Sequence, residues 1–243
     1  MARNPAYATV YDVLKKEIIE GDFAIGDLLP TEPELEKRFG VSRTTVRKAV
    51  DLLSREGFVQ ARQGKGTVVL DNRTKQNLNV VTSISETLRK KGYEVAPKSI
   101  YIDRIPASPH IAGDLGIEAG ALVVRVQRIE LADGKPIAIM KNYLKTEMVP
   151  GIEGHIGEIS SLYHFLEERY GINIDSAHDR ITARTADFTE AEMLNVTPGT
   201  ALLYMKRVCC SNGIPVCVDR LSLLGDRYEL EVDMTGRFKE SSM

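Results

Sequence analysis

The sequence predicts an α+β protein of two domains: a small helical domain that ends in a β-hairpin, and a larger α/β domain built on an antiparallel sheet. Two observations support this prediction. Residues 28–70 contain two short helical patterns followed by strands of period two. From about residue 80, long apolar strands alternate with short helices, and one pattern occurs twice. The 243 residues, 43% of them apolar, suffice for ordinary packed cores.

The N-terminal domain begins with a helix over residues 7–20. Its apolar side chains recur at helical spacing along one stripe, and Gly21 provides a stop. Thr31 is followed three residues later by Glu34, which is the signature of a capping box, and a second short helix extends from there to Gly40. These helices form the scaffold for the helix that follows.

A third helix starts after Ser42, which is a suitable N-cap. Its apolar spacing predicts an inner face made of Val46, Ala49, Val50 and Leu53. Its outer face carries the polar residues Arg43, Thr44, Arg47 and Lys48. Two short helices, a tight turn and a basic outer face predict a helix-turn-helix, in which the start of the last helix enters the major groove of DNA.

A β-hairpin is predicted directly after this helix. Residues 58–61 and 67–70 have strand character and flank a glycine-containing tip at residues 63–66. We expect this tip to reach the neighbouring minor groove, so that the domain is a winged helix-turn-helix.

Charge is distributed unevenly along the chain. The formal net charge is −2 and the pI is about 6.1, which argues against a generally basic nucleic-acid binder. Residues 37–66, however, contain eight basic side chains and only two acidic ones. A charge run alone is more often a solvated helix face, but the capped helices, the threonine pair and the glycine-rich hairpin together favour DNA binding.

The run LPTEPELEKRFGVSRTTVRKAV, with EGFVQARQGKGTVV after it, resembles the winged helix-turn-helix of GntR-type bacterial transcription regulators. The resemblance covers the first seventy residues. It implies operator contacts from the third helix and the wing, through Ser42, Arg43, Thr44, Thr45, Arg47, Gln63, Gly64 and Lys65. One departure is Pro33, where many relatives carry an arginine that touches DNA.

The domain boundaries follow from these patterns. Residues 1–70 form the predicted DNA-binding domain, and residues 71–79 are a polar run that is interpreted as the linker. Residues 80–243 form the second domain. Within it we expect a helix that starts at Ser83 and stops at Gly92, opened by another capping box, and further elements at residues 100–105, 121–131 and 136–144 (strands) and 160–170 (helix).

An internal repeat organises the second domain. Placing LGIEAGALVVRVQRIELADGKPIAI over LNVTPGTALLYMKRVCCSNGIPVCV superimposes Arg128 on Arg207 and Gly134 on Gly213. Each copy predicts a short helix, a glycine turn and a long hairpin. Two such hairpins, when paired, make a continuous antiparallel sheet with a pseudo-twofold axis, and a crevice near that axis is a reasonable ligand site.

This half resembles the UTRA effector-binding domain of the HutC subfamily of GntR regulators, whose fold is similar to that of chorismate lyase. In sugar-phosphate-sensing relatives, hydroxyl groups at two helix starts and an arginine on the long strand hold the phosphate. The resemblance implies that role for Ser83, Ser85, Arg128 and Ser161. The alternatives are plain N-capping for Ser83 and Ser161, and a structural salt bridge for Arg128.

Two departures from those relatives concern the ligand. Glu130 stands where they often carry a second arginine, and Met140 stands where they place an acid that binds sugar hydroxyls. A carboxylate beside Arg128 repels phosphate or occupies the guanidinium, so phosphate is disfavoured. The effector prediction therefore stays open between a sugar, a sugar phosphate, an amino acid and an organic acid, with Glu130 and Met140 among the effector-binding residues.

Neither catalysis nor a cofactor is predicted. The four histidines lack metal-ligand spacing, and no serine lies in a nucleophile-elbow motif, so an enzyme is supported only by fold analogy. The adjacent Cys209 and Cys210, with Cys217 on the next strand, are interpreted as buried reduced thiols, and a redox sensor is the alternative. No signal core or membrane span is found, so we expect a cytoplasmic protein that associates with the nucleoid when bound to its operator.

The sequence thus predicts a bacterial transcription regulator, a repressor, that binds palindromic half-sites as a homodimer. A small metabolite bound in the C-terminal domain would change the spacing of the two DNA-binding heads through the linker, with a coupling of roughly 1–3 kcal/mol. A metabolite-binding module without DNA function and an enzyme are the two other function classes.

Overall fold

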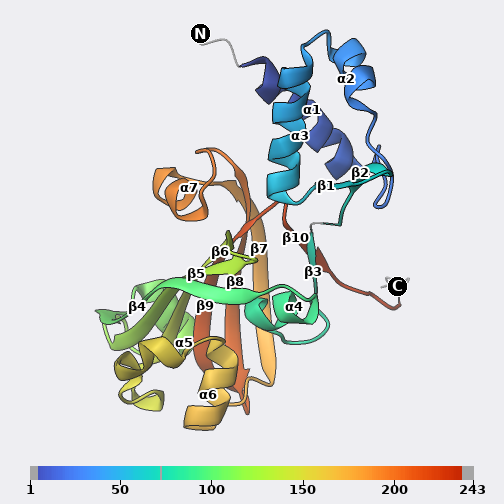
Figure 1. Cartoon of the computed structure of the whole chain (residues 1–243). Coiled ribbons are helices and arrows are strands. Elements are labelled where there is room, and N and C mark those ends of the chain that lie inside the picture. The colour runs from blue at the N-terminus through green and yellow to red at the C-terminus, as the bar shows by residue number, and fades with distance from the viewer. Residues whose placement is uncertain (1–4, 72, 237–243) are drawn as a thin grey trace, which may run out of the picture. The chain divides into compact units, whose positions relative to one another are not determined.

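The computed structural model describes residues 5–71 and 73–236, which form two compact units divided between Arg73 and Thr74 (Figure 1). Each unit has its own hydrophobic core. No helix in these residues has the length and apolar character needed to cross a membrane.

The first unit contains three helices and one hairpin: α1 (Ala6–Glu20), α2 (Glu32–Phe39), α3 (Arg43–Glu56), β1 (Val59–Arg62) and β2 (Gly66–Val69). The hairpin is antiparallel. The core of this unit is formed by apolar side chains from all three helices and the hairpin, among them Leu14, Leu35, Val46, Leu53 and Phe58. The predicted winged helix-turn-helix architecture is confirmed, with the strands shifted by about one residue.

The segment predicted as a linker, residues 71–79, contains a strand, and this is a correction. Strand β3 (Thr74–Asn77) pairs in parallel with β10 (Tyr228–Glu231) near the end of the chain. The side chains of Thr74 and Gln76 are fully buried. Sequence pattern failed here because the strand is stabilised by a distant partner and buries polar side chains in place of apolar ones.

The second unit is built on a six-stranded antiparallel sheet. Its strands are β4 (Val95–Pro106), β5 (Leu122–Ala132), β6 (Lys135–Lys145), β7 (Ser176–Thr185), β8 (Ala201–Ser211) and β9 (Ile214–Leu224). Its helices are α4 (Ile84–Lys90), α5 (Pro109–Leu115), α6 (Leu162–Tyr170) and α7 (Phe188–Leu194), with 3₁₀ turns at Thr146–Met148 and Ile152–Glu158. The strand order is β4-β5-β6-β9-β8-β7.

The sheet confirms the internal repeat. The two hairpins pair through β6 and β9, where Lys141 lies opposite Arg220, and these two residues are themselves related by the repeat offset. The pseudo-twofold axis therefore passes between them. Both hairpin turns place an Asp or Asn and then a Gly at positive φ, as in Asp133-Gly134, which is the geometry of a two-residue type I′ turn. Strand β7 and the N-terminal part of β4 were not predicted.

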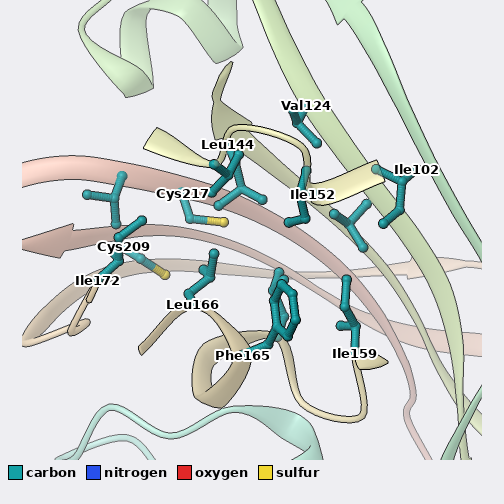
Figure 2. Close-up of a cluster of buried hydrophobic side chains, with 14 residues drawn as sticks. Ile102, Val124, Leu144, Ile152, Ile159, Phe165, Leu166, Ile172, Cys209 and Cys217 are labelled. Carbon is teal, nitrogen blue, oxygen red and sulfur yellow. The ribbon is translucent and has the colours of Figure 1, made fainter. Parts of the chain in front are cut away.

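Helices cover both faces of the sheet. One face packs against α4 and α6 through apolar clusters that include Leu88 and Leu166. The other face packs against α5 and α7. Figure 2 shows the cluster beneath α6, where Cys209 and Cys217 lie among aliphatic side chains. Both of these thiols are free and buried, as predicted, but Cys210 is only half-buried.

Candidate functional site

The start of α3 is ordered by Ser42. Its Oγ accepts a hydrogen bond from the backbone N–H of Thr45 at 3.4 Å and lies 2.9 Å from Thr45 Oγ1. Because Val46 and Ala49 are buried, the opposite side of the helix points to solvent, and Arg43, Thr44 and Arg47 are exposed there. The structure thus places the predicted major-groove residues on one open surface.

The two arginines on this surface share one acidic partner. Glu32, the first residue of α2, accepts from Arg43 Nε at 2.6 Å and from Arg47 Nε at 3.0 Å. The hydrogen bond from Arg43 lowers the pKa of Glu32 below its usual range and raises the pKa of Arg43. Both contacts use Nε, so the terminal guanidinium nitrogens have no hydrogen-bond partner in the described chain and remain available for guanine edges or phosphates.

The wing tip is equally open. Gln63, Gly64 and Lys65 are all exposed, and Gly64 has φ 73°, a conformation that suits glycine. The backbone N–H of Lys65 donates to the carbonyl of Arg62 at 3.0 Å, which closes the turn. A cationic side chain is thereby presented at the end of a short, constrained hairpin.

All six predicted effector residues are buried on or against the face of the sheet covered by α4 and α6. They are Ser83, Ser85, Arg128, Glu130, Met140 and Ser161. Ser85 Oγ donates to Glu130 Oε1 at 2.8 Å, and Arg128 Nε donates to Glu130 Oε2 at 3.3 Å. Arg128 therefore forms the salt bridge that was the alternative to ligand contact. Met140 lies opposite Arg128 in the sheet but packs in an apolar cluster.

The two helix-start serines differ. Ser83 caps α4, since its Oγ accepts from the N–H of Glu86 at 3.1 Å while Glu86 accepts from the N–H of Ser83. Ser161 precedes α6 but makes no side-chain cap. The two hydroxyl oxygens lie 3.5 Å apart, so the starts of the two helices meet over the sheet. The N-cap interpretation thus holds for Ser83 and is wrong for Ser161.

Four further polar residues join this cluster, and sequence reasoning did not identify them as site residues: Asn142, Tyr163, Arg207 and Asp219. Arg128 Nη1 donates to Asn142 Oδ1 at 3.0 Å. Asn142 Nδ2 and the Tyr163 hydroxyl each donate to Asp219 at 2.5 Å. Burial, followed by the nearby Asp219 charge, raises the pKa of Tyr163 well above its usual value. A continuous chain of hydrogen bonds therefore runs from α4 to α6 across three strands.

Arg207 is the counterpart of Arg128 in the second repeat. It donates to both oxygens of Asp179 at 2.7 Å, and its Nη1 donates to the carbonyl of Thr82 at 2.8 Å. Its side chain is only 3% exposed. The repeat offset, which superimposes Arg207 on Arg128, was the signal that could have identified this residue.

The comparisons with known proteins agree with this geometry. Residues 6–69 match the family described as bacterial regulatory proteins, gntR family, and residues 90–229 match the UTRA domain. The chain is 29% identical to the mannosyl-D-glycerate transport/metabolism system repressor MngR of Escherichia coli K12 over 84% of each chain. It is 30% identical to the probable transcriptional regulator PhnF of the same strain, over 83% of this chain and 84% of that protein.

A solved structure supports the same assignment. PhnF from Mycobacterium smegmatis superimposes with a TM-score of 0.66 at 27% identity, over 94% of this chain and 100% of that one. The chain belongs to the GntR family of bacterial regulatory proteins and carries a UTRA domain. It is a DNA-binding transcription regulator with an effector domain and not an enzyme.

Proposed function

We propose that the protein is a repressor that binds a palindromic operator as a homodimer and that a small metabolite bound beneath α4 and α6 changes its operator affinity. The observation that carries the DNA-binding part is the exposed pair Arg43 and Arg47 in the first turns of α3, both hydrogen-bonded to Glu32 at the start of α2. One winged head contacts little DNA, and two linked heads gain effective concentration on two half-sites. The protein acts in the cytoplasm and is associated with the nucleoid while it occupies its operator.

The contacts of β3 support a route for the effector signal. Thr82 O accepts hydrogen bonds from Arg207 and, at 3.1 Å, from Gln76 Nε2 on β3. Tyr228 on β10 donates to Gln76 at 3.0 Å. Because β3 begins directly after Arg73, where the DNA-binding unit ends, a ligand that moves Arg207 or α4 also moves the start of the second unit. Couplings of this kind are typically about 1–3 kcal/mol.

The test uses DNA selected from a random oligonucleotide pool by the full-length protein. Arg43→Ala should abolish preference for the selected sequence because base-edge contacts are lost. Lys65→Ala should weaken binding to all DNA and reduce the slope of log affinity against log salt by roughly 1, since one phosphate contact is lost. Failure to select any sequence, or unchanged discrimination in Arg43→Ala, would overturn the proposed use of α3.

A further inference from the structure

The polar cluster of the effector domain contains more buried negative charge than positive charge. Three carboxylates belong to it, Glu130, Asp179 and Asp219, together with the guanidinium groups of Arg128 and Arg207. Four of these side chains are at most 3% exposed, and Asp179 is 17% exposed. Charges at such depth are weakly screened, so an excess of one negative charge favours a cationic ligand.

Both arginines are already paired within the protein. Arg128 donates to Glu130 and Asn142, and Arg207 donates to both oxygens of Asp179 and to a backbone carbonyl. An incoming anion would have to separate one of these buried pairs and leave its carboxylate without a partner, which is costly. The arrangement therefore opposes a phosphate or a carboxylate at these arginines.

Asp219 is the carboxylate of this cluster that forms no ion pair within the described residues. Its oxygens accept from neutral donors, which are Asn142, Tyr163, Cys217 and Cys209, at 2.5, 2.5, 2.9 and 3.7 Å. Among residues 5–71 and 73–236, no lysine, arginine or histidine forms an ion pair with it. Arg207 lies directly opposite Asp219 in the sheet but turns its guanidinium to Asp179.

The internal repeat shows that the two copies place their acids at different positions. Asp219 occupies in the second copy the place that Met140 occupies in the first, and Cys209 corresponds to Glu130. Each copy thus contributes one arginine and one acid of the hairpin to the cluster, but the acid follows the arginine on the same strand in the first copy and lies on the next strand in the second. Asn142 lies opposite Asp219 in the sheet, donates to it and accepts from Arg128, so this amide links the acid of the second copy to the arginine of the first.

We propose that the effector carries a cationic nitrogen, an ammonium or an amidinium group, which donates to Asp219 and Glu130. This inference rests on the proposed effector role of the cluster. A cation that donates to Asp219 Oδ2 replaces the Tyr163 hydroxyl and so frees the start of α6 from the sheet. Charge neutralisation at Asp219 is thereby linked to movement of the helix whose first turn meets Ser83.

The experiment compares three small probes on the full-length chain by thermal unfolding at matched ionic strength: ethanolamine, the neutral analogue ethylene glycol, and inorganic phosphate. Ethanolamine should raise the unfolding midpoint of the wild-type protein, whereas ethylene glycol and phosphate should not. Asp219→Asn should weaken the apparent ethanolamine affinity at least about tenfold, because a charge-assisted contact is lost. Glu130→Gln is the second variant, in case Asp219→Asn does not fold.

Asp114→Asn is the matched control. Asp114 is a half-buried acid that pairs with Lys206 and lies outside the cluster. It should keep the full ethanolamine shift. An equal midpoint change in wild-type, Asp219→Asn and Glu130→Gln proteins would overturn the proposal, as would stabilisation by phosphate that Arg128→Met abolishes. DNA selection on the same wild-type preparation separates the two claims, because failure there rejects the regulatory function while the probe comparison still reports the ligand class.

Discussion

Arg43 on α3 donates from Nε to Glu32 on α2 at 2.6 Å, and Arg47, one turn later, donates to the other oxygen of the same carboxylate at 3.0 Å. One acid therefore sets the direction of two guanidinium groups on the surface that we propose faces DNA. It also places a negative charge beside that surface. For the proposed DNA contacts we expect two opposing effects, because the carboxylate orients the arginines toward base edges but weakens their attraction to phosphate.

Glu32→Gln should reduce sequence discrimination. Removal of the carboxylate should raise the affinity for unrelated DNA by up to about fivefold, which is the range expected for an exposed ion pair. The affinity for the operator should rise less, because the arginines are no longer aligned. Fluorescence anisotropy with the selected operator and a scrambled duplex measures both values. Glu20→Gln on α1, which removes an exposed acid that pairs with Lys16, should leave the ratio unchanged. An unchanged ratio in Glu32→Gln would show that Glu32 does not orient the arginines.

The two helix-start serines should differ in their effect on stability. Ser83→Ala removes the cap of α4 and should lower the unfolding free energy of the second unit by about 1 kcal/mol. Ser161→Ala removes no cap and only a 3.5 Å contact, so its cost should be at most about 0.5 kcal/mol. Urea denaturation measures both, with the exposed Ser160→Ala as control. Equal costs would contradict the distinction between the two helix starts.

Local sequence patterns identified those elements whose stabilising contacts are also local. The capping boxes at Thr31 and Ser83, and the turn at Asp133-Gly134, each depend on residues within a few positions of one another, and the structure contains all three. The internal repeat also predicted a contact between distant segments, because two copies of one hairpin pattern are expected to pair with each other. It correctly placed the junction of β6 and β9 at the centre of the sheet.

Contacts between distant segments were not predictable in the same way. Tyr163 and Asp219 are 56 residues apart, and no periodicity marks a hydrogen bond between a helix and a strand at that separation. Strand β3 is a similar case, since its partner β10 lies at the other end of the unit. The repeat did contain information that was not used: Asp219 is the counterpart of Met140, at which an acid was noted to be missing.

The pair of Arg128 and Glu130 should be strongly coupled in stability. Arg128→Met leaves a buried carboxylate with Ser85 as its remaining donor and should cost about 3–5 kcal/mol, whereas combining it with Glu130→Leu should restore most of that loss. Urea denaturation of the two single variants and the double variant gives the coupling free energy. Additive losses would mean that the pair contributes no mutual stabilisation in the folded protein.

The thiols at Cys209 and Cys217 should make the second unit sensitive to alkaline pH. Burial, together with the neighbouring Asp219, raises the pKa of both thiols well above their usual value. The unfolded chain, with thiol pKa values of about 8.5, releases these protons first as pH rises. Their contribution to stability is therefore fully present below about pH 8.5 and is lost above it, at up to about 1.4 kcal/mol per pH unit for each thiol.

Urea denaturation between pH 7.5 and about 10 tests this expectation. The range ends near pH 10 because this is the tyrosine pKa in the unfolded chain. Cys217→Ala should roughly halve the slope of unfolding free energy against pH, while Cys210→Ala, which removes the same atoms from a half-buried position, serves as the control.

A thiol reagent added to the native protein at pH 8 should not modify Cys209 or Cys217 until the protein unfolds, because the thiolate is the reactive form. Rapid modification of both in the folded protein would instead revive the redox-sensor alternative, since it would require thiolates that the buried, carboxylate-flanked site disfavours.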